Sequence, residues 1–342
     1  MKLVTGGTGL IGAHILFDLC QKDVSIRATK RTSSSFQFIN SLFEFYSPDN
    51  YEMLLEKIQW IDADLNDIDS LIEATKGIEH VYHAAAIVSH QSKDANTMIR
   101  SNITGTANLV NACKENGIKK IGHVSSVAAL GMSKNGAAVT EHSQWKISKK
   151  NSAYAISKHG GEREAWRIHE EGVDVVIVNP SLVTGPGDWN NSSTSIFKLV
   201  YNGLKYYTNG STGFVDVRDV SKSIIQLVES DVSGERFIIS SQNLRWKEVF
   251  ELISDAFGLP HPRIHVTKFK AEMAWRLLLV ISWFTGKPSK VTKESARASL
   301  RQRDFSNQKI REYINIDFID IKTSIADTTA FIQDFYVKNR RK

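Results

Sequence analysis

The sequence predicts an α/β fold in which a doubly wound parallel sheet is followed by a smaller C-terminal lobe. Short apolar segments alternate with amphipathic helices along the first two thirds of the chain, as in βαβ units. A glycine-rich turn lies between the first predicted strand and the first predicted helix. The composition agrees with a globular protein, because 42% of the 342 residues are hydrophobic and 23% are charged.

Each predicted strand is a short apolar run with polar or glycine residues at its ends. The predicted strands are Lys2–Thr5, Val24–Thr29, Gln59–Ile61, His80–Ala84, Lys120–Ser125 and Val173–Asn179. Helical periodicity predicts the helices Ile11–Lys22, Ile68–Thr75, Asn96–Asn116 and Tyr154–Glu171. Helices between successive strands allow parallel pairing, with helices covering both faces of the sheet.

The glycine-rich turn predicts a Rossmann-type dinucleotide site. Gly6, Gly9 and Gly12 are three residues apart, between a strand and a helix. Glycines with this spacing permit a tight turn, a close approach of the backbone to a pyrophosphate, and close packing of the helix on the strand. The N-terminus of the helix then offers free N–H groups and a positive dipole to the phosphates. This context disfavours the alternative of an ordinary glycine turn.

The end of the second strand predicts NADP(H) as the preferred cofactor, with NAD(H) as the alternative. An acidic residue about twenty residues after the glycine turn would bind the ribose 2′-hydroxyl of NAD. Here the strand runs into Lys30-Arg31-Thr32-Ser33-Ser34, which has no carboxylate. We expect Arg31, together with Lys30, to bind the 2′-phosphate, because arginine binds phosphate in a bidentate manner. The competing interpretation makes both residues surface charges.

After about Gly185 the alternation of strands and helices weakens. We therefore expect residues 1–184 to form the dinucleotide-binding domain and residues 185–342 to form most of a substrate-binding lobe. Two segments with strand character, Phe214–Val217 and Glu235–Ser240, are expected to return to the main sheet. Loops are expected at Gly185–Ser195 and Thr208–Gly213, and helices at Trp246–Phe257 and Glu272–Phe284.

Charge and cysteine usage argue against several classes of protein. The net charge of +6 is concentrated late in the chain, without a nucleic-acid-binding motif, and predicts a solvated surface and no nucleic-acid partner. The basic segments are Lys287–Lys293, Arg297–Arg311 and Lys338–Lys342. Cys20 and Cys113 lack the spacing of metal ligands, so we expect no metal site and a reducing compartment.

We expect a cytoplasmic protein with no targeting peptide and no transmembrane segment. An apolar strand follows Met1 directly, without the features of a signal peptide. The longest apolar run, Leu277–Phe284, is too short to cross a bilayer. We expect it to be a helix that faces the core, while the alternatives are a helix on a membrane surface and the wall of an apolar substrate pocket.

Three residues form the predicted catalytic set. Tyr154 and Lys158 are four residues apart and share one face of a helix. A neighbouring ammonium lowers the pKa of a phenol, which allows proton transfer near neutral pH. Ser126 follows a predicted strand and is placed to hydrogen-bond the reacting oxygen. The alternative for Ser125 and Ser126 is a helix cap.

With these motifs in order, the chain resembles the extended short-chain dehydrogenases/reductases. This superfamily includes nucleotide-sugar epimerases, dihydroflavonol reductases and 3β-hydroxysteroid dehydrogenases. The similarity extends from Met1 to about Val220. The other motifs that carry it are Asp64-Leu65, His83–Ala86, Asn102–Thr106, Asn179–Val183 and Phe214–Val217.

The resemblance implies further site residues and a homodimer. It implies that Asn102 supports the catalytic helix and a water linked to Lys158. The residues alone leave Asp64 equally well explained as a helix cap. Dimerisation would use the helices Asn96–Asn116 and Tyr154–Glu171. The cofactor contacts implied are Gly6, Gly9, Leu10, Ile11, Gly12, Asp64, Leu65, Ala84, Ala85, Ala86, Ser125, Lys158, Pro180, Ser181 and Val183.

We expect reduction of a carbonyl, or oxidation of a secondary alcohol, by hydride transfer with NADP(H). Besides the basic pair after the second strand, Thr212 and Gly213 favour this reaction, because sugar-nucleotide enzymes commonly carry a diphosphate-binding arginine there. The apolar segment Trp275–Phe284 suits a less polar substrate.

Two alternatives stay open. The first is a nucleotide-sugar epimerase or dehydratase with tightly bound NAD, in which Lys198, Lys205 or Arg218 contacts the diphosphate. The second is a redox-inactive protein that binds the dinucleotide as a sensor. Redox-inactive relatives usually lose the tyrosine or the lysine, so the presence of Ser126, Tyr154 and Lys158 disfavours the sensor interpretation.

Overall fold

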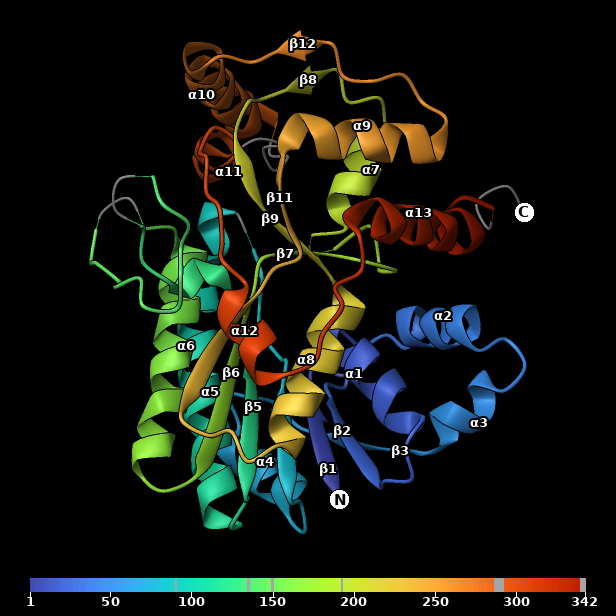
Figure 1. Ribbon diagram of the computed structural model, residues 1–342, viewed down its shortest axis with the longest axis vertical. Helices are drawn as coiled ribbons and strands as arrows, with labels where there is room; N and C mark the ends of the chain where they lie inside the picture. The colour runs from blue at the N-terminus through green and yellow to red at the C-terminus, as the bar shows by residue number, and fades with distance from the viewer. Residues whose placement is uncertain (90, 134–135, 149–150, 192, 286–291, 339–342) are drawn as a thin grey trace.

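The main element of the computed structural model is a seven-stranded sheet in the order β10-β6-β5-β4-β1-β2-β3 (Figure 1). Every neighbouring pair in this sheet is parallel. This order is that of a Rossmann-type sheet, so the predicted fold class is confirmed. The strands are β1 (Lys2–Thr5), β2 (Ile26–Lys30), β3 (Ile58–Asp62), β4 (His80–His83), β5 (Lys120–Val124), β6 (Asp174–Pro180) and β10 (Glu235–Ile239).

The structure describes residues 1–89, 91–133, 136–148, 151–191, 193–285 and 292–338. Two of the predicted basic segments, Lys287–Lys293 and Lys338–Lys342, lie partly outside these residues.

Alternate residues of the central strands face two separate hydrophobic cores. In β6, Val176 and Val178 belong to one core, whereas Val175 and Ile177 belong to the other. Burial on both faces explains why these strands are continuous apolar runs in the sequence. The first core is covered by α1 (Leu10–Cys20) and α8 (Val217–Glu229), and the second by α4 (Ile68–Thr75), α5 (Ala95–Glu115) and α6 (Ala153–Glu170).

Two further helices, α2 (Gln37–Tyr46) and α3 (Tyr51–Glu56), connect β2 to β3. These two helices were not predicted from the sequence. They extend the first core, where Phe43 and Leu42 of α2 are fully buried and Leu54 of α3 is nearly so.

One of the two segments expected to return to the main sheet does not do so. Glu235–Ile239 joins the edge of the main sheet as β10, but Phe214 and Val215 lie in β9 (Ser211–Asp216) of a separate three-stranded sheet. Because β9 pairs with β7 (Leu182–Thr184) on one side and with β11 (Gln242–Arg245) on the other, neither of its edges is free. The prediction for Phe214–Val217 was therefore wrong.

The C-terminal lobe has its own core, which includes Trp189, Phe197 and Phe214. The predicted helix Trp246–Phe257 is confirmed as α9, and it ends at Gly258, whose φ of 67° suits glycine. The lobe also contains α7 (Ser195–Tyr201), β8 (Tyr206–Tyr207), β12 (Ile264–His265), α10 (Lys268–Thr285), α11 (Lys293–Ala298), α12 (Gln308–Tyr313) and α13 (Ile321–Ile332).

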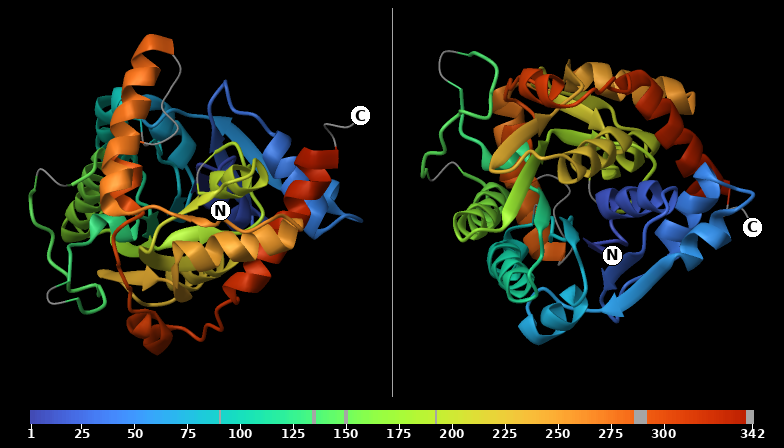
Figure 2. Two further views of the ribbon diagram at one scale, coloured as in Figure 1. Left: turned by 90° about the horizontal axis from the view of Figure 1, so that it is seen from above. Right: turned by 60° about the horizontal axis from the view of Figure 1, so that its bottom comes forward.

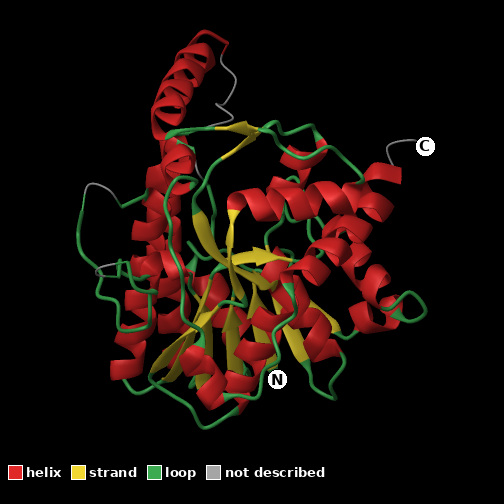
Figure 3. Ribbon diagram, turned by 45° about the horizontal axis from the view of Figure 1, so that its top comes forward, coloured by secondary structure: helices red, strands yellow, loops and turns green. Residues whose placement is uncertain are grey.

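Helix α10 contains the apolar run Leu277–Phe284. This run was predicted to face the core, and that prediction was wrong. Leu277, Leu279, Trp283 and Phe284 are each more than half exposed. Figures 2 and 3 show α10 extending outward from the lobe. Within the part of the chain that the structure describes, no helix is long and apolar enough to span a membrane.

Candidate functional site

A large cleft of about 2840 Å³, here the main cleft, lies at the carboxyl ends of the central strands. Ala84 after β4, Ser125 after β5 and Pro180 at the end of β6 line one wall. The lobe supplies the other wall, which includes Trp246 and Phe250 of α9. Small-molecule pockets usually measure about 300–1,000 Å³, so this cleft has room for a dinucleotide and a substrate together. In parallel sheets ligands bind at this edge.

The glycine loop folds tightly at the start of α1. Gly6 has a φ of +72°, and a Cβ there would lie 2.7 Å from Ala85 Cα. A Cβ at Gly12 would lie 2.1 Å from the carbonyl oxygen of Gly6, so any side chain would force the turn open. The loop is closed by the Gly9 N–H, which donates to Gly6 O at 2.9 Å.

The start of α1 offers its backbone to the main cleft. Gly9, Leu10, Ile11 and Gly12 all line the main cleft. No side chain among the described residues caps α1 at Gly9, and its first turn carries no acidic residue. The first N–H groups and the positive end of the helix dipole are therefore available to an anion, as a pyrophosphate requires.

The structure separates the two basic residues after β2. Arg31 lines the main cleft with Ser33 and Ser34, and its backbone N–H donates to Ser34 Oγ at 3.0 Å. Lys30 does not line the main cleft, because its Nζ lies 2.7 Å from Asp62 Oδ1 on the neighbouring β3. Of the two basic residues, Arg31 therefore lines the main cleft and Lys30 does not.

Asp64 and Leu65 lie away from the lining of the main cleft. Asp64 Oδ1 accepts a hydrogen bond from the Asn66 N–H at 2.8 Å and closes a local turn. The interpretation of Asp64 as a helix cap is wrong, because Asp67 caps α4. Leu65 packs against Gly105 of α5, where a Cβ would lie 2.7 Å from the Leu65 Cβ.

The Ala84–Ala86 turn follows β4 beside the glycine loop. Ala84 and Ala86 line the main cleft, whereas Ala85 does not. The Ala85 N–H instead donates to Thr5 Oγ1 at 3.4 Å, which ties the turn to the end of β1. On the other side of the cleft, Pro180, Ser181 and Val183 belong to its lining.

The predicted catalytic residues Ser126, Tyr154 and Lys158 line the main cleft together. A hydrogen bond joins the side chains of Ser126 and Tyr154. Burial raises the pKa of the Tyr154 phenol, and the hydrogen bond from Ser126 opposes this rise. The net shift of this pKa is upward, opposite to the lowering expected beside Lys158, because desolvation dominates. Ser126 Oγ also accepts from Ala128 N at 3.1 Å, so the helix-cap alternative is observed as well.

Lys158 is buried at the end of β5. Its Nζ donates to Val124 O at 3.0 Å, and the residue is only 8% exposed. Burial lowers the pKa of the Lys158 ammonium to about 8, while the negative charge of Glu162 acts in the opposite direction. The amine therefore titrates close to neutral pH.

Glu162 is a central residue that the sequence analysis missed. It is 2% exposed and accepts hydrogen bonds from Ser125 Oγ at 2.6 Å and Asn179 Nδ2 at 2.8 Å. Its other oxygen forms a salt bridge of 2.8 Å with Arg236 of β10. The available signal was the spacing, since Glu162 continues the four-residue steps from Tyr154 to Lys158 along α6.

Asn102 connects three elements behind the catalytic helix. Its Oδ1 accepts from the Ile87 N–H at 2.8 Å, and its Nδ2 donates to Ile87 O at 2.9 Å and to Ser157 Oγ at 3.1 Å. Asn102 therefore holds α5, the segment after β4 and α6 together beside Lys158. The water implied between Asn102 and Lys158 stays a prediction.

The lobe wall carries basic residues that the sequence analysis did not select. Lys293, Arg301 and Arg303 line the main cleft, whereas Lys198, Lys205 and Arg218 do not. Arg218 instead forms salt bridges of 2.8 Å with acidic residues of β9 and α13. Its interpretation as a diphosphate contact is therefore not supported.

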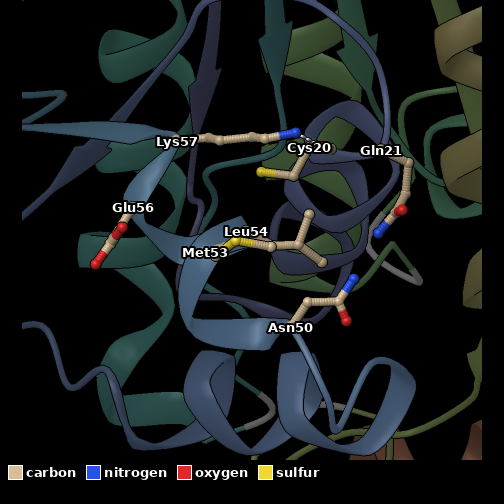
Figure 4. Close-up of a pocket in the computed structure, with 7 residues that line it drawn as sticks. All are labelled: Cys20, Gln21, Asn50, Met53, Leu54, Glu56 and Lys57. Carbon is tan, nitrogen blue, oxygen red and sulfur yellow. Dashed lines mark hydrogen bonds between the residues drawn. The ribbon is translucent and has the colours of Figure 1, made fainter.

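A second hollow, of about 500 Å³, lies between α1 and α3 (Figure 4). Lys57 donates to the backbone oxygen of Cys20 at 2.8 Å, and burial raises the pKa of the Cys20 thiol to about 12. A thiol that stays protonated is a poor nucleophile, so we assign no chemistry to this hollow. Among the described residues, no group of three His, Cys, Asp or Glu side chains is placed to hold a metal ion.

Comparisons with known proteins agree with this geometry. Residues 2–240 match the NAD dependent epimerase/dehydratase family. The "Putative dihydroflavonol 4-reductase" of Synechocystis sp. is 30% identical over 345 residues, covering 98% of this chain and 96% of that protein. Cinnamoyl-CoA reductase 1 of Petunia hybrida is 27% identical, covering 97% and 91%. The solved structure of gox2253 has a TM-score of 0.80 and 26% identity, covering 98% of both chains.

The first prediction concerns the charge of Glu162. In Glu162→Gln the amide keeps the size of the side chain but removes the negative charge that favours the Lys158 ammonium. We expect the pKa of Lys158 to fall from about 8 by roughly 1 in this variant. The measurement is the pH dependence of the lysine ¹³Cε signals by NMR. Glu170→Gln, an exposed change on the same helix, is the control, and an unchanged Lys158 titration in Glu162→Gln would contradict the prediction.

Proposed function

The chain belongs to the NAD dependent epimerase/dehydratase family, and from this premise we propose that it is an NADP(H)-dependent reductase. It would reduce a small-molecule carbonyl to a secondary alcohol, or catalyse the reverse oxidation. The observation that carries the proposal is that Ser126, Tyr154 and Lys158 line the same cleft as the glycine loop. Similarity to two proteins named as reductases, over nearly the whole chain, supports it.

The residues of the main cleft fit a nicotinamide dinucleotide. The start of α1 and the glycine loop would hold the pyrophosphate, and Arg31 with Ser33 and Ser34 would hold the 2′-phosphate. Pro180 and Val183 would lie beside the nicotinamide. When bound, the cofactor supplies or accepts the hydride. We propose that residues 1–184, with β10, form this dinucleotide-binding part and that most of 185–342 forms the substrate wall.

Tyr154 is the proposed proton donor in the reductive direction. Its raised pKa keeps the phenol protonated at neutral pH, so a proton is available as negative charge develops on the carbonyl oxygen. Ser126 would donate a hydrogen bond to the same oxygen. The nearby ammonium of Lys158 would stabilise the phenolate that remains after proton transfer.

A second candidate is a nucleotide-sugar epimerase or dehydratase with tightly bound NAD. The basic lobe wall favours it, since Lys293, Arg301 and Arg303 line the main cleft and the buried Nε of Arg303 has no hydrogen-bond partner among the described residues. Such a wall suits a diphosphate. A redox-inactive sensor is a weaker third candidate. Homodimerisation through α5 and α6 and a cytoplasmic location stay predictions.

Mass spectrometry of the small molecules released from the denatured protein separates the reductase from the epimerase. An enzyme that exchanges its cofactor in every cycle is expected to release little dinucleotide and to bind added NADPH. Stoichiometric NAD(H) retained through purification would move the epimerase to first place.

Arg31→Ala tests the choice of cofactor. Loss of the guanidinium removes a charge-assisted contact to the 2′-phosphate, so we expect NADPH affinity to fall about tenfold or more while NADH affinity changes little. Titration followed by nicotinamide fluorescence gives both dissociation constants. Lys30→Ala is the matched control, because Lys30 is paired with Asp62. Equal affinity of the unmodified protein for NADH and NADPH would refute the assignment.

Tyr154→Phe tests the proton donor. Turnover is expected to fall by about 10²–10⁴-fold, because the ring remains but the transferable proton is lost. Cofactor affinity and the unfolding temperature should stay near those of the unmodified protein. Steady-state kinetics with a panel of carbonyl substrates, thermal unfolding and NADPH titration measure the three quantities. A parallel loss of stability and activity would indicate a structural tyrosine, and retained turnover would exclude Tyr154 as the donor.

A further inference from the structure

Helix α10 exposes a continuous apolar stripe to solvent. Five of its side chains, here the α10 stripe, are 45–76% exposed. They recur at steps of three or four residues, so they lie on one face of the helix. The α10 stripe consists of Phe269, Met273, Leu277, Ile281 and Phe284. Trp283, at 79%, is exposed next to it.

The opposite face of α10 attaches the helix to the lobe. Ala271 is buried, and Trp275, Leu278 and Ser282 are partly buried. The α10 stripe is therefore not the packing face of the helix, and nothing in the described chain covers it. Exposed apolar groups in such a continuous patch indicate a contact surface.

The sequence around α10 is strongly basic. Residues 263–301 contain nine lysines and arginines and only two acidic residues, so this stretch alone carries more than the whole net charge of +6. Lys268, Lys270 and Arg276 are exposed on α10 itself. Its single acidic residue, Glu272, is neutralised by Arg276 at 2.7 Å and by Arg297 at 3.2 Å.

An exposed apolar stripe with basic flanks favours a lipid surface as the partner over a second protein chain. Two copies of so basic a segment would repel each other, which disfavours self-association through α10. The α10 stripe is also only one helix wide, whereas stable protein interfaces bury about 800 Å² on each partner. A lipid surface needs no complementary shape, and anionic headgroups match the basic flanks. Exposed tryptophan and phenylalanine are typical of helices that lie in a membrane interface.

We propose that α10 docks the protein on an anionic phospholipid bilayer, with the α10 stripe among the acyl chains and Lys268, Lys270 and Arg276 among the headgroups. The helix would lie in the plane of the interface and would not span it. Its lysines would extend their charged ends toward the phosphates.

Docking in this way also orients the main cleft. The Arg297–Glu272 salt bridge of 3.2 Å ties α10 to α11. Lys293, Glu294 and Arg297 of α11 line the main cleft. One wall of the main cleft would therefore lie close to the bilayer, where an apolar substrate would be concentrated.

Vesicle co-sedimentation of the full chain tests the proposal. We expect binding to vesicles of equal parts phosphatidylcholine and phosphatidylglycerol, weaker binding to phosphatidylcholine alone, and weakening by high salt. The double change Phe269→Ser with Leu277→Ser removes two exposed apolar groups, and the partition coefficient should fall by at least about tenfold. Lys268→Glu with Lys270→Glu should weaken binding to the anionic vesicles only.

Met53→Ser is the matched control, because Met53 is 63% exposed on α3, away from α10. Circular dichroism and NADPH titration should be unchanged in every variant, which separates this test from that of the proposed reductase. Equal vesicle binding by the stripe variant and the unmodified protein would overturn the proposal. So would an absence of vesicle binding combined with an oligomer, seen by light scattering, that the stripe variant dissociates.

Discussion

The buried carboxylate of Glu162 is the constraint on which the site and the edge of the sheet both depend. A charge that is 2% exposed must be paired and hydrogen-bonded, and each partner of Glu162 belongs to a different element. Ser125 fixes the end of β5, Asn179 fixes β6, and Arg236 fixes β10. One side chain thus holds three neighbouring strands at the edge where the main cleft opens.

Helix α6, which carries Glu162, also carries the two predicted catalytic residues Tyr154 and Lys158. Tyr154, Lys158 and Glu162 follow each other by one turn of α6, so fixing Glu162 also fixes the other two. Burial then acts on each group according to its charge. It raises the pKa of the Tyr154 phenol and lowers that of the Lys158 ammonium, and so moves the two values apart. A proton donor and a titratable cation result from packing and not from unusual residues.

The parts of the fold that depend on local sequence could be predicted. Strands such as β6 are continuous apolar runs because both faces are buried, and the glycine loop allows no side chain at Gly12. The predictions that failed depend on distant partners. Phe214 and Val215 lie in β9, whose two edges are filled by β7 and β11, and not in the main sheet. No pattern near these residues indicates those partners.

The two walls of the main cleft differ in how far they can be predicted from local sequence. The sheet wall is fixed by the parallel ladder and by motifs that can be read in order along the sequence. The lobe wall combines α9, α11 and the segment around Arg303, which meet only in three dimensions. A change in a few of these side chains alters the substrate without altering the sheet, and a single scaffold then serves both reductases and epimerases. The sheet wall could therefore be predicted from the sequence, whereas the aromatic and basic residues of the lobe wall, Trp246, Phe250, Arg301 and Arg303, could not.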